Sequence, residues 1–96
     1  DQRAIIRRRL AGVPGLRVHD SDATFILLQA GHFTAAEMAS RMLEHRLLIR
    51  NCENFKGLDS HFFRISIQDP DTNAKAADLI ADYAENRAQT AGRENP

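Results

Sequence analysis

The chain has 96 residues, of which 43% are hydrophobic and 27% are charged, and its formal net charge is zero. This length fits one compact domain with a modest core and argues against two domains. Because the chain has no net charge, it has no overall field that would attract nucleic acid or an anionic membrane. Any recognition of an anion must therefore be local.

Cysteine content and hydropathy bear on the compartment. Cys52 is the only cysteine in the sequence, so no internal disulfide can form, which favours a reducing compartment. No apolar run approaches the roughly 20 residues of a membrane span, and no signal-peptide pattern opens the chain. We therefore expect a cytoplasmic protein. Because the chain begins at Asp1, without Met, and enters a helical pattern at once, we expect a domain of a longer protein.

The first third of the chain predicts one helix and two strands. Residues 2–10 have a helical pattern, which the glycines and proline of residues 12–15 end. Residues 16–19 form a short strand candidate. Residues 23–29 are rich in β-formers and apolar at successive positions, so we expect a strand that is buried on both sides.

A capping box predicts the next helix. Thr34 is a good N-cap, and Glu37 lies three residues later, as the capping box requires. The helix is expected to run to His45. Its apolar side has three residues at helical spacing: Met38, Met42 and Leu43.

The rest of the chain predicts two strands and a final helix. Residues 47–50 and 62–67 are strand candidates, and the loop between them turns at Gly57. Residues 69–72, Asp-Pro-Asp-Thr, end the second strand and cap the helix. The apolar stripe of this helix is Ala76, Leu79, Ile80, Tyr83 and Ala84.

The order of elements is (α)ββαββα, which predicts an α+β fold with a small, mainly antiparallel sheet and helices packed on one face. Residues 1–12 read as the end of a longer linking helix, residues 13–87 as the domain itself, and residues 88–96 as a polar, flexible tail.

Two arginines stand beside apolar strand residues. Strand alternation divides residues 62–67 into an odd-numbered core face and an even-numbered face that includes Arg64. Arg64 could lie on a solvated face with its guanidinium beside Phe62, or it could be a half-buried arginine that receives an anion. Arg50 could likewise mark the solvent end of its strand or bind an anion.

Three stretches together carry a family resemblance: Ile49-Arg50-Asn51-Cys52, Asn54-Phe55-Lys56-Gly57-Leu58-Asp59-Ser60 and Phe63-Arg64-Ile65-Ser66-Ile67. They resemble the small C-terminal domain of pyridoxal-phosphate enzymes of the aspartate aminotransferase fold (fold type I). The resemblance covers roughly residues 10–85. It is greatest to the histidinol-phosphate aminotransferase branch, and especially to threonine-phosphate decarboxylases of cobalamin biosynthesis.

The resemblance implies a role for both arginines. In that family the residue at the position of Arg64 holds the substrate's carboxylate, and the residue at the position of Arg50 faces its distal end, where we expect phosphate. The implied function is substrate binding in an enzyme acting on a phosphorylated amino acid, either a decarboxylase, which we favour, or a histidinol-phosphate-type aminotransferase. The implied parent is a homodimer.

The resemblance also implies what this chain lacks. Pyridoxal 5'-phosphate needs a Schiff-base lysine and a phosphate cradle, which the family places in a large domain of the same chain. Neither Lys56 nor Lys75 matches the catalytic position. The 96-residue chain alone is therefore expected to contain no catalytic or cofactor-binding residue and to be inactive.

Other interpretations remain open or are disfavoured. A stand-alone α+β ligand-binding or interaction module would have no apolar surface left over, whereas a fragment of an enzyme would. Residues 7–9, three arginines, lack the aromatic residues and basic tail of a nucleic-acid site. Cys52 reads as a structural thiol. The four histidines show no metal-ligand spacing: His19, His32, His45 and His61.

Overall fold

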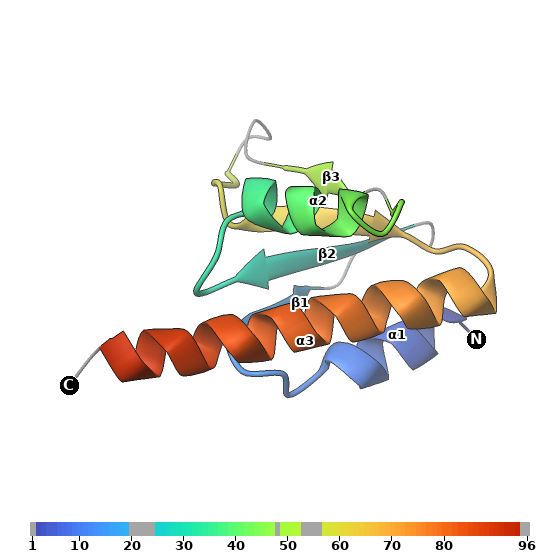
Figure 1. Ribbon diagram of the computed structural model, residues 1–96. Coiled ribbons are helices and arrows are strands. Elements are labelled where there is room, and N and C mark those ends of the chain that lie inside the picture. Colours follow the sequence, from blue (N-terminus) through green and yellow to red (C-terminus); the bar gives the residue numbers. More distant parts are fainter. Residues whose placement is uncertain (1, 20–24, 48, 53–56, 95–96) are drawn as a thin grey trace.

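The computed structural model describes residues 2–19, 25–47, 49–52 and 57–94. Within these residues the chain forms a four-stranded antiparallel sheet in the order β1-β2-β4-β3, with three helices (Figure 1). The elements are α1 (Gln2–Leu10), β1 (Leu16–His19), β2 (Phe25–Ala30), α2 (Ala35–Leu43), β3 (Arg50–Asn51), β4 (Phe62–Ser66) and α3 (Pro70–Glu94). The predicted α+β class and element order are confirmed.

The start of the chain follows the prediction closely. Helix α1 and strand β1 have the predicted bounds. The turn between them favours glycine at Gly15, because its φ is +75°; a Cβ there would also lie 2.6 Å from Cδ2 of the exposed His32, whose ring would have to move. Helix α1 packs against the rest of the domain, since Ile6 and Leu10 are buried in the common core.

The predicted capping box starts α2. The Thr34 hydroxyl accepts the Glu37 N–H at 3.2 Å, and the Glu37 carboxylate accepts the Thr34 N–H at 3.2 Å. The helix ends at Leu43 rather than His45, because Arg46 adopts a left-handed φ of +61° in the following turn. Leu43, predicted on the apolar side, is 62% exposed, and the buried residues of α2 are Ala35, Met38 and Met42.

The second predicted strand pair is shorter than expected. The strand predicted at 47–50 is reduced to Arg50–Asn51, because the chain is still leaving the turn after α2 at Leu47; Leu48 lies outside the described residues. Strand β4 ends at Ser66, one residue early. Gly57 has a φ of +84°, as the predicted loop requires, while residues 53–56 of that loop lie outside the described part.

The final helix begins as predicted and continues further. The Asp69 carboxylate accepts the Thr72 N–H at 3.0 Å and caps the first turn. The helix then runs to Glu94 and so includes residues 88–94 of the predicted tail, because residues 84–92 contain no proline and several strong helix formers. Its buried side is set by Ala77, Ile80, Ala81 and Ala84, while Ala76, Leu79 and Tyr83 of the predicted stripe are only partly buried.

One core lies between the helices and one face of the sheet. Strand alternation sends Ile26, Leu28 and Ala30 of β2 into this core, and Phe63 and Ile65 of β4 join them. The prediction that β2 is buried on both sides is therefore wrong. Its other face, with Phe25 and Leu27, is only half-buried because the three helices pack on the opposite side of the sheet (Figure 1).

Candidate anion-binding site

The face of the sheet away from the helices, which we call the open face, combines arginines, aromatic rings and polar side chains. The strand register assigns to it Arg17, His19, Phe25, Leu27, Gln29, Arg50, Phe62, Arg64 and Ser66. Among the described residues, no helix covers this face. It is therefore the part of the fold where side chains that do not serve the core can meet a ligand.

The two arginines predicted as site residues are direct neighbours on this face. Arg50 of β3 lies opposite Arg64 of β4, which in turn lies opposite Leu27 of β2. Arg64 is half-buried and Arg50 is exposed. Like charges at opposed positions of a sheet are mutually destabilising, so an anion placed between them would be favoured electrostatically.

Arg64 lies against an aromatic ring. Its guanidinium carbon lies 4.6 Å from the centroid of the Phe25 ring on β2. The partner suggested by the sequence, Phe62, instead packs against His19, with ring centroids 5.7 Å apart. His19 Nε2 shares a hydrogen bond of 3.0 Å with Oε1 of Gln29. Sequence reasoning missed Phe25, because only the strand register reveals that it lies diagonally across from Arg64.

Cys52 lies beneath this site as a structural residue. Its side chain is fully buried, and its backbone N–H donates to the Phe62 carbonyl at 3.0 Å, which extends the β3–β4 pairing. Burial raises the pKa of the Cys52 thiol, while the nearby charges of Arg64 and Arg50 act in the opposite direction. The thiol is therefore protonated at neutral pH and a poor nucleophile, in keeping with the structural role predicted for it.

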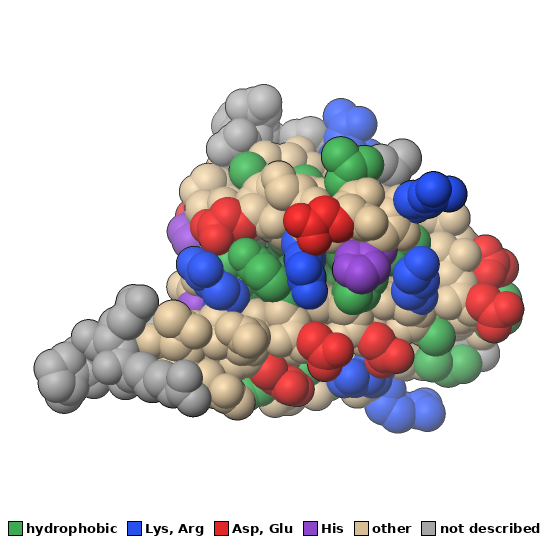
Figure 2. All heavy atoms as spheres, in the orientation of Figure 1, with side chains coloured by type: hydrophobic (Ala, Val, Ile, Leu, Met, Phe, Trp, Pro, Cys, Tyr) green, Lys and Arg blue, Asp and Glu red, His purple; other side chains and the backbone are tan. Residues whose placement is uncertain are grey.

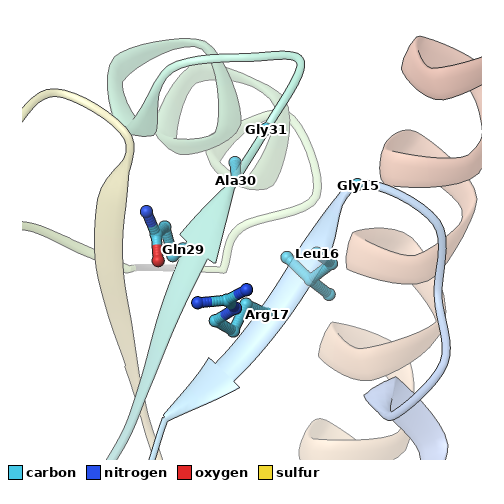
Figure 3. Close-up of a pocket in the computed structure, with 6 residues that line it drawn as sticks. All are labelled: Gly15, Leu16, Arg17, Gln29, Ala30 and Gly31. Atoms are coloured by element: carbon cyan, nitrogen blue, oxygen red, sulfur yellow. The ribbon is translucent and has the colours of Figure 1, made fainter.

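A cavity of about 350 Å³ lies at one end of β1 and β2. Arg17 and Gln29, which are paired across these strands, line it together with Gly15 and Gly31 (Figure 3). Arg17 is exposed and Gln29 is half-buried. Sequence reasoning did not single out either residue. Strand alternation assigns each of them to a face, but the β1–β2 register is needed to bring them together.

The helix-covered side has a different character. Figure 2 shows acidic and basic side chains interspersed over it, with hydrophobic side chains between the helices. Lys75 lies here, exposed on α3, and its Nζ donates to the His45 carbonyl at 3.4 Å. In the described part of the chain, no three potential ligands gather into a metal-binding group, and no helix is long and apolar enough to cross a membrane.

Comparisons with known proteins connect this fold to a group of enzymes. No family model matches the chain. A curated histidinol-phosphate aminotransferase of Methanoculleus marisnigri is 34% identical over 74 residues, which are 77% of this chain and 21% of that protein. The crystal structure of L-threonine-O-3-phosphate decarboxylase from Porphyromonas gingivalis superposes with a TM-score of 0.78 and 36% identity, covering 85% of this chain and 26% of that one.

A third match agrees with these two. The histidinol-phosphate aminotransferase of Clostridium acetobutylicum has a TM-score of 0.79 and 27% identity, covering 88% of this chain and 26% of that one. This chain is homologous to one segment of the aminotransferase-fold enzymes. The resemblance predicted from the sequence is thus confirmed, and the chain spans about a quarter of the length of its aminotransferase-fold relatives. The matched aminotransferase and the matched decarboxylase have similar sequence identity to this chain, so the comparisons support both kinds of enzyme equally.

Proposed function

We propose that this chain is the substrate-binding small domain of a pyridoxal-phosphate-dependent enzyme that acts on a phosphorylated amino acid. Arg64 binds the substrate's carboxylate and Arg50 binds its phosphate. The observation that carries the proposal is the opposed placement of Arg50 and Arg64 on the open face of the sheet. We favour L-threonine-O-3-phosphate decarboxylase of cobalamin biosynthesis as the parent, and a histidinol-phosphate-type aminotransferase is the alternative.

The chemistry of the two side chains suits such a substrate. An arginine can hold a carboxylate through two parallel hydrogen bonds, which fixes the orientation of the adjoining carbon as well as its charge. A second arginine on the neighbouring strand adds a cation within reach of a second anionic group. Threonine phosphate carries a carboxylate and a phosphate in one small molecule, whereas histidinol phosphate has no carboxylate but its co-substrate 2-oxoglutarate has two. The two arginines therefore suit either reaction, and we favour the decarboxylase because residues 51–52 and 55–60 resemble that enzyme most.

The described residues do not fit the cofactor itself. Pyridoxal phosphate forms a Schiff base with a lysine, but Lys75 is exposed on the helix-covered side, away from Arg64, and Lys56 lies outside the described residues. We therefore assign cofactor binding and bond cleavage to the remaining three quarters of the parent protein. The 96-residue chain alone is expected to be inactive.

One experiment separates the two candidate reactions. The full-length parent is mixed with L-threonine phosphate, or with histidinol phosphate and 2-oxoglutarate, while carbon dioxide release and glutamate formation are measured. Carbon dioxide from the first mixture establishes the decarboxylase. Glutamate from the second establishes the aminotransferase and leaves the fold assignment intact. If neither product forms, a different substrate or the stand-alone binding module becomes the better interpretation.

A second experiment tests the role of Arg64. In the full-length protein, Arg64→Ala should lower kcat/KM roughly 100-fold or more, because the substrate loses its orienting contact, while the absorbance of the bound cofactor stays unchanged. Arg41→Ala is the matched control, since Arg41 is on α2 and pairs with Glu44 at 3.1 Å, remote from the open face. An unchanged rate for Arg64→Ala would refute the assignment.

A further inference from the structure

Phe25 and Arg64 form a unit on the open face. Leu27 is the residue directly opposite Arg64, and Phe25 lies two positions before Leu27 on β2, opposite Ser66. Phe25 is thus the diagonal neighbour of Arg64. Aromatic and long side chains in diagonal positions of neighbouring strands are close enough to touch. The guanidinium carbon lies 4.6 Å from the ring centroid, and both side chains are half-buried.

This contact restricts the arginine in a way that serves binding. An unrestrained arginine side chain has many rotamers, and binding a carboxylate requires it to adopt one of them. An aromatic ring attracts the guanidinium to its face, whereas a carboxylate binds a guanidinium through the N–H groups at its rim, so the two contacts use different parts of the group. Leu27, on the same strand and face, adds an apolar boundary directly opposite the backbone of Arg64.

We propose that Phe25 is a positioning residue that holds the guanidinium of Arg64 in the orientation needed to bind the substrate's carboxylate. This inference rests on the proposed function, because it assumes that Arg64 contacts substrate. It assigns no chemical step to Phe25. The ring lowers the cost of ordering Arg64 on binding, so its loss weakens substrate binding more than it slows the reaction of bound substrate.

The test uses the full-length protein and steady-state kinetics with its substrate. Phe25→Leu should raise KM roughly fivefold, as expected for loss of a cation–π contact at a partly exposed site, and kcat should change less. Phe25→Tyr keeps the ring and should retain the wild-type KM. Phe25→Met, which has similar bulk without a ring, is a second variant in case Phe25→Leu does not fold.

A matched control and a double mutant exclude a merely structural role. Tyr83→Leu removes another half-buried ring that lies near an arginine, here Arg87 at 6.0 Å, but on the helix-covered side, and should leave KM unchanged. In an Arg64→Gln background, Phe25→Leu should have little additional effect on KM, because the group that it positions is gone. An equal rise in KM in both backgrounds would overturn the inference.

The outcomes also separate this inference from the proposed function. If Arg64→Ala impairs substrate binding but both Phe25→Leu and Phe25→Met keep the wild-type KM, the positioning role is wrong and the role of Arg64 stands. If Arg64→Ala itself leaves KM and kcat/KM unchanged, the proposed function is wrong, and the role of Phe25 falls with it.

Discussion

The two faces of the sheet differ although they are built from the same strands. On β4, Phe63 is fully buried against the helices, while its neighbour Phe62 is half-buried on the open face beside His19. The helix-covered face contributes apolar side chains to one core, and the open face carries the arginines. We infer that the first face determines whether the domain folds and that the second determines what it binds.

The largest effect on stability is expected when an aromatic ring is removed from the core. Phe63→Ala should lower the free energy of unfolding by about 3–5 kcal/mol, because it leaves a cavity in a packed core. Phe62→Ala, one residue away on the open face, should lower it by only about 1 kcal/mol. Urea unfolding of the 96-residue chain and both variants measures the difference. Equal losses would mean that the two faces do not divide stability and function as we infer.

A smaller effect on stability is expected at the start of α2, one of the three helices that cover the sheet, which we call the covering layer. Thr34→Ala should lower the free energy of unfolding by about 1 kcal/mol, since it removes the N-cap of the helix. Ser40→Ala is the control, because Ser40 is exposed in the interior of the same helix and alanine is the better helix former there. A loss at Ser40 as large as that at Thr34 would contradict a specific capping effect. Both changes should leave substrate binding by the full-length protein intact.

Acidification should also lower the stability that the start of α2 contributes. The hydrogen bond from the Thr34 backbone N–H holds the pKa of Glu37 below its usual value of 4.5. Burial acts in the opposite direction, and the Thr34 hydroxyl, Arg87 and Tyr83 lower the pKa further. A carboxylate with a lowered pKa in the folded state contributes its stability in full above about pH 4.5, and this contribution is lost as the pH falls through the lowered value.

The expected size of this effect is below about 1 kcal/mol, because the side chain of Glu37 is 40% exposed and its ion pair with Arg87 is screened by solvent. Unfolding free energies measured from pH 6 down to pH 3 should fall less steeply for Glu37→Gln than for the wild type. Part of the slope will remain, because hydrogen bonds from Thr72 also lower the pKa of Asp69. Identical slopes would show that Glu37 does not contribute.

The smallest effect on stability is expected on the open face. Arg50→Gln should change the free energy of unfolding by no more than about 0.5 kcal/mol, because Arg50 is exposed and the change removes a like charge opposite Arg64. The same variant in the full-length protein should bind its phosphorylated substrate more weakly. If Arg50→Gln destabilises the domain as much as Phe63→Ala does, the open face also holds the fold together.

The sequence predicted an element boundary well where the residues that form it are close together in the chain. The turn at residues 12–15, the capping box of Thr34 and Glu37, and the Asp69 cap each depend on residues within a few positions of one another. The end of α2 and the short β3 were predicted less well, because the left-handed turn at Arg46 is not marked by glycine or asparagine.

The sequence by itself determined the α+β class, the order of elements, the family resemblance and the choice of Arg50 and Arg64, since these follow from periodicity, capping and recognisable motifs. Only the tertiary structure decided that one face of β2 is open, that the two arginines are opposed, and that Phe25 rather than Phe62 lies against Arg64. The reason is that strand register joins residues far apart in the chain, and which residues become neighbours depends on how the whole core packs.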